Sequence, residues 1–245
     1  MRFFLRCWIP ALLSIGCVSQ AQKNCAAEAK LLLVASQTKT AVTALNAGKK
    51  RTVQIYFFDT SSLNLMSQGV ILRLRRGAAA DLTVKLRLPT HTKTDGIPGR
   101  HERYKCEDDV IGGLPVRSYS MQTKFAGPPA PRGSEILGSL SAAQKQLLEQ
   151  AQVSIDWTQV KRIADIKSTV WQIKGQPRFT NLTLELWEWS AGEVLELSTK
   201  VGVDAAPSTY AQLVHLASTN GLSLSSNQTS KTALVLENVA HTPTH

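Results

Sequence analysis

The chain has 245 residues, of which 43% are hydrophobic and 19% are charged, so it can bury the core of one domain and is not disordered as a whole. Its formal net charge of +10 favours anionic partners: phosphorylated small molecules, polyphosphate, nucleic acid or anionic lipid. The basic residues are spread along strand-like segments and do not form one run, which argues against a DNA-binding arm and against specific nucleic acid recognition.

Residues 1–21 predict a signal peptide that is removed on export. Arg2 and Arg6 form its positive start, and the apolar run of residues 7–18 is too short to span a bilayer comfortably. Ser19 and Ala21 supply the small residues of a cleavage site. We therefore expect a secreted or periplasmic protein. Without Arg2 and Arg6, 26 basic residues face 18 acidic ones, a net charge of +8.

The cysteines leave two questions open. Cleavage before Cys17 is the alternative to a free mature chain: it would give a lipoprotein, and only then do we expect a membrane partner. After export Cys25 and Cys106 remain, and an oxidising compartment permits a disulfide between them, although either could be a buried thiol. Two cysteines are too few for a zinc ligand set.

Strand-like alternation of apolar and polar residues recurs through the chain and predicts a mostly antiparallel sheet or barrel. Helical patterns are fewer: residues 38–47, residues 141–151 with Ser139 or Ser141 as N-cap, and residues 207–220, which Gly221 ends. The strand-like segments are residues 24–34, 52–58, 69–76, 82–88, 101–107, 167–174, 181–189 and 194–201.

The remaining segments define a single domain, residues 22–240, followed by a disordered tail, residues 241–245. Between residues 111 and 139 the chain is rich in Gly, Pro and Ser, and its stretch AGPPAPRGS, residues 126–134, predicts a loop or mobile lid inside that domain. Asp59 and Thr60 are expected to fix a turn. The tryptophans are expected to pack in the core, although Trp187 is placed so that it could stack on a ring.

The polar faces of the strands admit two architectures. In one, an antiparallel sheet is covered by helices on one face, and its charges are solvated on the other. In the other, the barrel is turned inside out, with leucines under helices and charges along a tunnel. Arg73 and Arg75 on one strand, next to Lys85 and Arg87 on the following one, would repel unless an anion lay between them. A triphosphate would suit these side chains, and carboxylates on another wall could hold Mg²⁺ or Mn²⁺.

Six stretches resemble, in order, the motifs of the CYTH family, the triphosphate tunnel metalloenzymes. They cover about residues 26–236 and include a tyrosine–aspartate–threonine signature before an R-x-R strand, a basic strand, a mid-chain helix, a late acidic strand pair and a terminal serine–lysine. The stretches are YFFDTSSLNLMSQGVILRLRRG, LTVKLRLP, RHERYKCEDDV, SLSAAQKQLLEQA, LTLELWEWSAGEVLELSTKV and PSTYAQLVHLASTNGLSLSSNQTSKTAL.

The resemblance implies an α+β fold, an eight-stranded antiparallel tunnel barrel with flanking helices. It also implies a metal site for Mg²⁺ or Mn²⁺. In this family the first strand carries E-x-E-x-K, which here reads Ala26, Glu28 and Lys30, and a second late glutamate is replaced by Ser198. Each replacement removes a carboxylate and weakens the expected metal binding. The implied metal ligands are Glu28, Glu102 and Glu196; the implied phosphate ligands are Lys30, Arg73, Arg75, Lys85, Arg87 and Lys231.

The expected function is binding of a phosphorylated anion, such as tripolyphosphate or a nucleoside triphosphate, in a basic tunnel, with hydrolysis by a divalent metal. The alternative is a non-catalytic binder of polyphosphate or organophosphate in the cell envelope. A third class is a structural envelope protein whose barrel charges only pair with one another.

Overall fold

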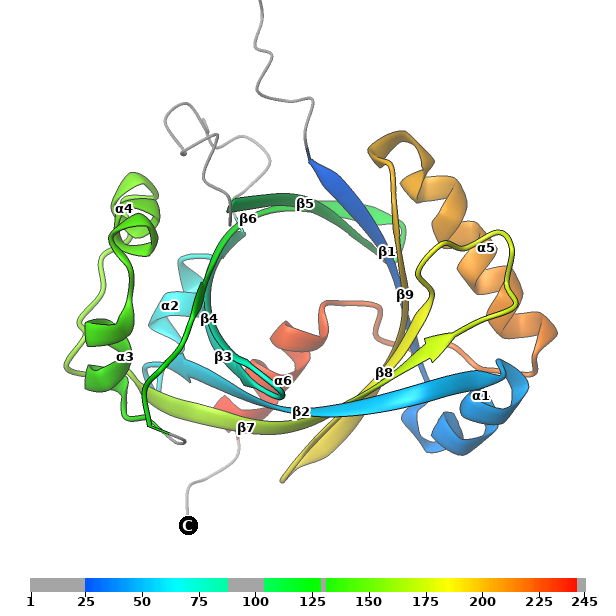
Figure 1. The fold of residues 1–245 in the computed structure, drawn as a ribbon, viewed down its shortest axis with the longest axis horizontal. Coiled ribbons are helices and arrows are strands. Elements are labelled where there is room, and N and C mark those ends of the chain that lie inside the picture. The colour runs from blue at the N-terminus through cyan, green and yellow to red at the C-terminus, as the bar shows by residue number, and fades with distance from the viewer. Residues whose placement is uncertain (1–24, 88–103, 129–130, 242–245) are drawn as a thin grey trace, which may run out of the picture.

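The computed structural model describes residues 25–87, 104–128 and 131–241, and they form one closed β-barrel flanked by helices (Figure 1). The strand order around the barrel is β1-β5-β6-β4-β3-β2-β7-β8-β9, with β9 paired back to β1. All pairs are antiparallel except β1 with β5. The strands are β1 Ala26–Leu33, β2 Ala47–Asp59, β3 Val70–Arg76, β4 Ala80–Arg87, β5 Tyr104–Ile111, β6 Leu114–Lys124, β7 Lys161–Ile173, β8 Thr183–Trp189 and β9 Gly192–Val201.

The barrel turned inside out is the observed architecture, and the one-sided sheet is wrong. The expectation of eight antiparallel strands differs in two respects, because the barrel has nine strands and one parallel pair. The helices are α1 Thr38–Ala44, α2 Asn64–Ser67, α3 Gly133–Ser139, α4 Ala142–Gln150, α5 Ala206–Thr219 and α6 Lys231–His241, with short 3₁₀ turns at Ala35–Gln37 and Val203–Ala205.

The additional strand, β6, lies in the segment rich in Gly, Pro and Ser, where no strand was predicted. Its outward residues Tyr119 and Met121 are buried, but Ser120 and Gln122 face the barrel interior. Tyr119 and Met121 are the only two large apolar residues at successive outward positions of this strand, and the inward residues Ser120 and Gln122 are small or polar. The period-two alternation in the sequence is therefore weak. The strand nevertheless pairs with both β4 and β5 and closes this side of the barrel.

Two hydrophobic clusters cover the outside of the barrel. On one side α3 and α4 pack on β3, β4 and β6 through residues such as Leu74, Leu82 and Leu147. On the other side α1 and α5 pack on β1, β8 and β9 through residues such as Leu31 and Leu213. Each fully buried leucine contributes about 1.5–3 kcal/mol relative to exposure. Because these leucines take the outward positions, the alternating charged residues must point inward.

Helix α6 lies across one end of the barrel interior, within the ring of strands in Figure 1. Its residues Val235 and Leu236 are buried and pack against Ile55 and Phe57, which point inward from β2. This end of the interior is therefore filled by apolar side chains, and the polar cavity lies beyond it. The first residue of α6, Lys231, reaches into that cavity.

Three local predictions are confirmed: the N-cap of α4, the end of α5 and the turn at Asp59. Ser141 is the N-cap of α4, and its hydroxyl accepts a hydrogen bond from the backbone N–H of Gln144. Gly221 follows α5 with φ +69°, a conformation that favours glycine. The carboxylate of Asp59 accepts hydrogen bonds from backbone N–H groups before and at the start of α2, including that of Leu65 at 2.8 Å. Asp59 therefore fixes the turn as expected.

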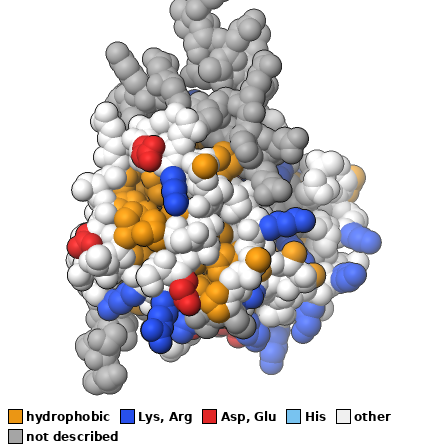
Figure 2. Space-filling model, turned by 60° about the vertical axis from the view of Figure 1, so that its left-hand side comes forward, with side chains coloured by type: hydrophobic (Ala, Val, Ile, Leu, Met, Phe, Trp, Pro, Cys, Tyr) orange, Lys and Arg blue, Asp and Glu red, His pale blue; other side chains and the backbone are white. Residues whose placement is uncertain are grey.

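Cys25 and Cys106 form a disulfide, with their Cα atoms 4.6 Å apart. It joins the start of β1 to β5, the one parallel strand pair among the described residues. On the outer surface, the face in Figure 2 carries more Lys and Arg than Asp and Glu side chains, in line with the positive net charge. None of the helices in the described part of the chain has the length and apolar character needed to cross a membrane.

Candidate functional site

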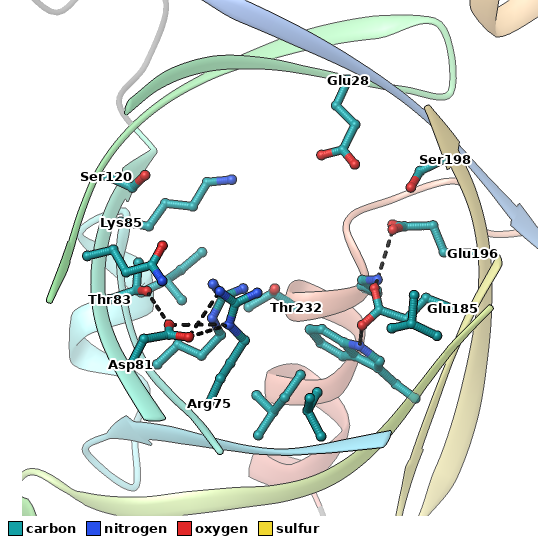
Figure 3. Close-up of a pocket in the computed structure, with 18 of the residues that line it drawn as sticks. Glu28, Arg75, Asp81, Thr83, Lys85, Ser120, Glu185, Glu196, Ser198 and Thr232 are labelled. Carbon is teal, nitrogen blue, oxygen red and sulfur yellow. Dashed lines mark hydrogen bonds and ion pairs between the residues drawn. The ribbon is translucent and has the colours of Figure 1, made fainter. Parts of the chain in front are cut away.

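A cavity of about 580 Å³ lies inside the barrel and is lined by charged side chains. Arg75 and Lys85 lie on one side of it, and Glu185 and Glu196 lie on the opposite side (Figure 3). Among the described residues, nine basic and five acidic side chains line the cavity, a net charge of +4. They are Lys30, Arg51, Arg73, Arg75, Lys85, Arg87, Lys105, Lys200 and Lys231, with Glu28, Asp81, Glu107, Glu185 and Glu196.

The basic wall is formed by strands β3 and β4, whose inward positions alternate with buried leucines. The strand register places Arg75 opposite Asp81, and the two form a bidentate ion pair, with Nε and Nη2 of Arg75 each 3.1 Å from Oδ2 of Asp81. The repulsion expected between neighbouring basic strands is therefore partly relieved by a carboxylate. The basic wall comprises Arg73, Arg75, Lys85 and Arg87.

Arg73 is the exception on this wall, because it forms no hydrogen bond or ion pair with another described residue. Its Nε is fully buried and without a hydrogen-bond partner. Burial, followed by repulsion from the adjacent Arg75, lowers the pKa of Arg73 to about 10. The guanidinium remains cationic at neutral pH, so the cavity holds a positive charge that no described carboxylate contacts.

Asp109 of β5 is fully buried and binds three cations. Its Oδ1 lies 2.8 Å from the ammonium of Lys30, and its Oδ2 lies 2.8 Å from that of Lys85 and 3.7 Å from Nη2 of Arg87. Burial opposes ionisation of the carboxyl, but Lys30 and Lys85 hold the pKa of Asp109 well below its usual range. This carboxylate therefore fixes three of the cationic side chains at one end of the cavity.

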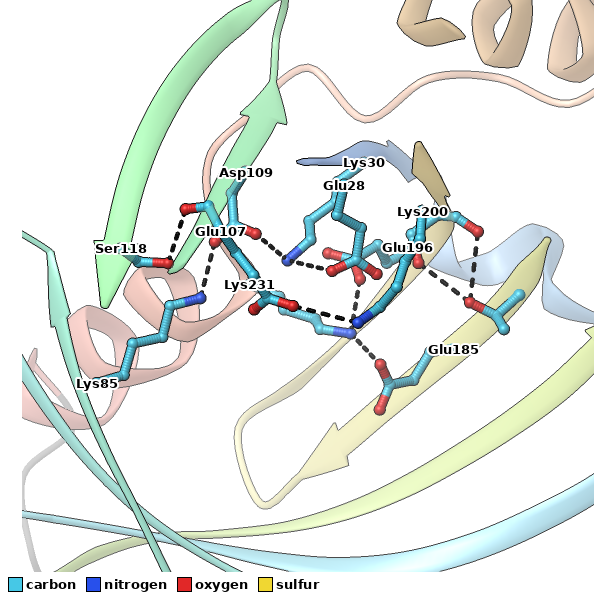
Figure 4. A network of polar contacts seen from close by, with 12 residues as sticks. Glu28, Lys30, Lys85, Glu107, Asp109, Ser118, Glu185, Glu196, Lys200 and Lys231 are labelled. Carbon is cyan, nitrogen blue, oxygen red and sulfur yellow. Dashed lines mark hydrogen bonds and ion pairs between the residues drawn. The ribbon is translucent and has the colours of Figure 1, made fainter. Parts of the chain in front are cut away.

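The acidic wall consists of Glu185 on β8 and Glu196 on β9, and Lys231 lies between them (Figure 4). The ammonium of Lys231 is 2.8 Å from Oε1 of Glu196 and also binds Oε2 of Glu185. The second oxygen of Glu185, Oε1, accepts hydrogen bonds from Ser168 Oγ at 2.5 Å and Trp187 Nε1 at 2.8 Å. Trp187 lies under the ammonium of Lys231 and packs as expected, and it also contacts the cavity.

Eight of the nine site residues predicted from the sequence line the cavity; the ninth, Glu102, lies outside the described residues. Their roles in binding remain predictions, but the structure brings them together from four strands and a helix. The eight are Glu28, Lys30, Arg73, Arg75, Lys85, Arg87, Glu196 and Lys231.

Four acidic residues of the site were not predicted from the sequence: Asp109, Glu107, Asp81 and Glu185. A signal for the first two existed, because Lys105, Glu107 and Asp109 recur at period two. In the sequence, the predicted ligand Glu102 shares the other set of alternating positions with Cys106, which is bonded to Cys25. In the structure Glu107 pairs with a lysine of β9, Lys200, at 3.2 Å.

The metal site implied by the family resemblance does not fit the side chains observed. Within the described residues, no group of three or more Asp, Glu, His or Cys side chains is arranged to hold a metal ion. Glu28 pairs with Lys30 at 3.2 Å, and Glu196 pairs with Lys231. Both oxygens of Glu185 already have partners. Carboxylates that are paired with lysines lack the charge complementarity that Mg²⁺ or Mn²⁺ requires.

Uncharged residues, Ala26 and Ser198, stand at the two positions where the resembled family carries glutamates. Ala26 is exposed at the start of β1. Ser198 is buried on β9, lines the cavity, and its hydroxyl lies 3.1 Å from that of Thr183 (Figure 3). Neither residue supplies a carboxylate to the cavity, in agreement with the absence of a ligand cluster among the described residues.

No family model and no curated protein matches the sequence. Solved structures do match. One is HpAC1 from Hippeastrum, a proposed adenylyl cyclase described as having a dominant triphosphatase activity. It is 18% identical with a TM-score of 0.56, and the match covers 86% of this chain and 94% of that chain. A proposed adenylate cyclase from Bacillus halodurans matches with 15% identity, TM-score 0.58, and 86% and 97% coverage. At these identities the similarity shows the fold, a CYTH-like tunnel barrel with flanking helices.

Proposed function

We propose that the barrel cavity binds a phosphorylated anion such as tripolyphosphate, a nucleoside triphosphate or a related organophosphate. The observation that carries this proposal is Arg73, a guanidinium that faces the cavity with no carboxylate partner among the described residues and with a pKa lowered to about 10. Every other member of the basic wall already binds a carboxylate. An anion in the cavity would relieve this unpaired charge and accept hydrogen bonds from a planar guanidinium.

The same observation argues against a purely structural barrel. In such a barrel, the buried cations would be expected to pair with buried anions, because an unpaired buried charge destabilises the fold. Arg75, Lys85 and Arg87 follow that pattern, and Arg73 does not.

The proposal is tested by titrating the protein with tripolyphosphate in an isothermal calorimeter. We expect saturable binding by the wild type and a loss of affinity of about 10- to 100-fold in Arg73→Met, since a charged hydrogen bond contributes about 1.5–3 kcal/mol. Arg162→Met is the matched control, because Arg162 pairs with Asp165 outside the cavity lining. Equal affinities for wild type and Arg73→Met would overturn the proposal.

Hydrolysis of the bound anion is the second candidate function. It is favoured by the triphosphatase activity described for HpAC1, which shares this fold. Activation by Mg²⁺ or Mn²⁺ would have to use Glu28, Glu196 and Glu102; the first two are ion-paired, and Glu102 lies outside the described residues. Release of phosphate from tripolyphosphate with either metal, abolished in Glu196→Ala, would support the hydrolase; binding without release would support the non-catalytic binder.

We also propose that the protein acts outside the cytoplasm, as the N-terminal pattern of residues 1–21 predicts. The disulfide between Cys25 and Cys106 supports an oxidising compartment. Secretion or periplasmic export of a tagged full-length chain, with mass spectrometry of the mature N-terminus, distinguishes cleavage after Ala21 from lipidation at Cys17.

A further inference from the structure

Glu185 and Glu196 are direct partners in the register of strands β8 and β9. Two carboxylates placed opposite one another on neighbouring antiparallel strands repel, so the arrangement is unfavourable unless a cation lies between them or one of them is protonated. Both side chains point into the barrel, away from bulk water, which strengthens the repulsion. The acidic wall therefore requires a cation as part of its structure.

Lys231 supplies that cation from within the chain. Lys231 is the first residue of α6, and only 9% of the residue is exposed. Its ammonium contacts both carboxylates. The ammonium also lies 4.6 Å from the centre of the Trp187 ring, a favourable cation–π distance. A lysine at a helix N-terminus has the wrong sign for the helix dipole, so these contacts are what hold it there.

The hydrogen bonds of Glu185 show that the site is complete with Lys231 in place. One oxygen binds Lys231, and the other accepts from Ser168 and Trp187. Burial opposes ionisation of this carboxyl, but Lys231 and the two hydrogen bonds lower the pKa of Glu185 to about 2. Glu185 is thus ionised at neutral pH, and both carboxylates already bind the chain's own ammonium.

We propose that the ammonium of Lys231 takes the place of a divalent cation between Glu185 and Glu196, so that the cavity binds its phosphorylated anion without a metal ion. This inference rests on the proposed function. The anion is then held directly by the basic wall and by Lys30, with no metal bridging its oxygens to a carboxylate. This direct binding distinguishes the cavity from the metal-dependent site that the family resemblance implies.

The first test uses the wild-type protein and needs no variant. Tripolyphosphate is titrated in a calorimeter in the presence of EDTA and, separately, of Mg²⁺. We expect binding in EDTA to be at least as tight as binding with Mg²⁺. Binding that requires Mg²⁺ would overturn this inference and leave the proposed function standing. Absence of binding under both conditions would overturn the proposed function, and the inference with it.

The second test asks whether Lys231 occupies a cation position. Mn²⁺ alone is titrated into the wild type, Lys231→Met, and the double variant Lys231→Met with Glu196→Gln. We expect no saturable Mn²⁺ site in the wild type, a new site in Lys231→Met, and its loss in the double variant. A saturable site in the wild type that Glu196→Gln removes, or no site in Lys231→Met, would overturn the inference.

Thermal unfolding identifies a variant that does not fold. In that case Lys231→Gln, which keeps a hydrogen-bond donor for the carboxylates but no charge, replaces Lys231→Met in the Mn²⁺ titration. The wild-type titrations decide the question independently of either variant.

Discussion

The basic wall and the acidic wall of the cavity are built in the same way and differ in how their charges are balanced. In both, inward side chains alternate with buried leucines on two adjacent antiparallel strands. On the acidic wall, Lys231 binds both Glu185 and Glu196, and Ser168 and Trp187 occupy the second oxygen of Glu185. On the basic wall, Arg73 has no carboxylate partner in the described chain.

This difference shows which kind of ligand the cavity can accept. An incoming cation would find carboxylates that are already paired, whereas an incoming anion would find an unpaired guanidinium. Asp109 binds Lys30 and Lys85 on the basic side of the cavity, but no described carboxylate binds Arg73. Asymmetry in pairing, more than the number of charges of each sign, determines the preference for anions.

The largest effect is expected from removing the buried carboxylate that holds the basic side together. Asp109→Asn leaves Lys30 and Lys85 without their shared partner and should lower the free energy of unfolding by about 3–5 kcal/mol in phosphate-free buffer. Urea denaturation measures the loss, and added tripolyphosphate should restore part of it. Asp108→Asn is the neighbouring control, since Asp108 pairs with the half-exposed Arg117; an equal loss in both variants would contradict the central role of Asp109.

The acidic wall should show the next largest effect, as a dependence of stability on pH. The pKa of Glu185 is about 2 in the folded chain and 4.5 without that environment, so the unfolded chain binds more protons between these values. The contribution of Glu185 is fully present above about pH 4.5 and is lost as the pH falls toward 2. Glu185→Gln should flatten the fall of the melting temperature in this range, and Glu188→Gln, in an exposed pair with Lys167, should not.

Replacing the unpaired arginine should have a smaller effect on stability, and one of opposite sign. Arg73→Met removes a partly buried charge without a partner while keeping an apolar side chain, so the unfolding free energy should rise by about 1 kcal/mol in phosphate-free buffer. Arg87→Met removes a guanidinium that binds Asp109 and Ser230 and should lower it. A loss of stability in Arg73→Met as large as in Arg87→Met would show that Arg73 is paired in solution.

The smallest effect is expected at Ser230, which connects the two walls. Its hydroxyl accepts a hydrogen bond from Nη1 of Arg87 at 2.6 Å and from the backbone N–H of Ala233 at 3.2 Å, next to Lys231. Ser230→Ala should lower the unfolding free energy by about 1 kcal/mol, as expected for loss of a helix cap. Its affinity for tripolyphosphate should fall less than that of Arg73→Met; a larger fall would move the main anion contact to this end of the cavity.

Much of the fold was predictable because leucines and charges alternate along single strands. Segments such as residues 69–76 and 194–201 carry both faces of a strand in their own sequence, and both were found as strands. Strand β6 was not predictable in this way, since its inward face carries Ser120 and Gln122 and its outward face has few large apolar residues. Its place depends on pairing with β4 and β5, which are distant in sequence.

The candidate site was predictable in its composition and less so in its pairing. Lys30, Arg73 and Lys85 were expected on inward faces, and they line the cavity. Asp109 was missed because a run of three acidic residues, 107–109, does not show which member faces inward until the register with β1 and β6 is known.

The sequence by itself therefore determined which residues share the charged side of most strands, because period-two alternation is a local property. Closure of the barrel then placed that side in its interior. Only the tertiary structure decided which charges neutralise one another. Lys231 meets Glu185 and Glu196 because α6 packs across the end of the closed barrel. Arg73 has no partner among the described residues, because barrel closure brings none of their carboxylates into contact with it. Coulomb interactions depend on distance in space, and those distances are set by closure and register.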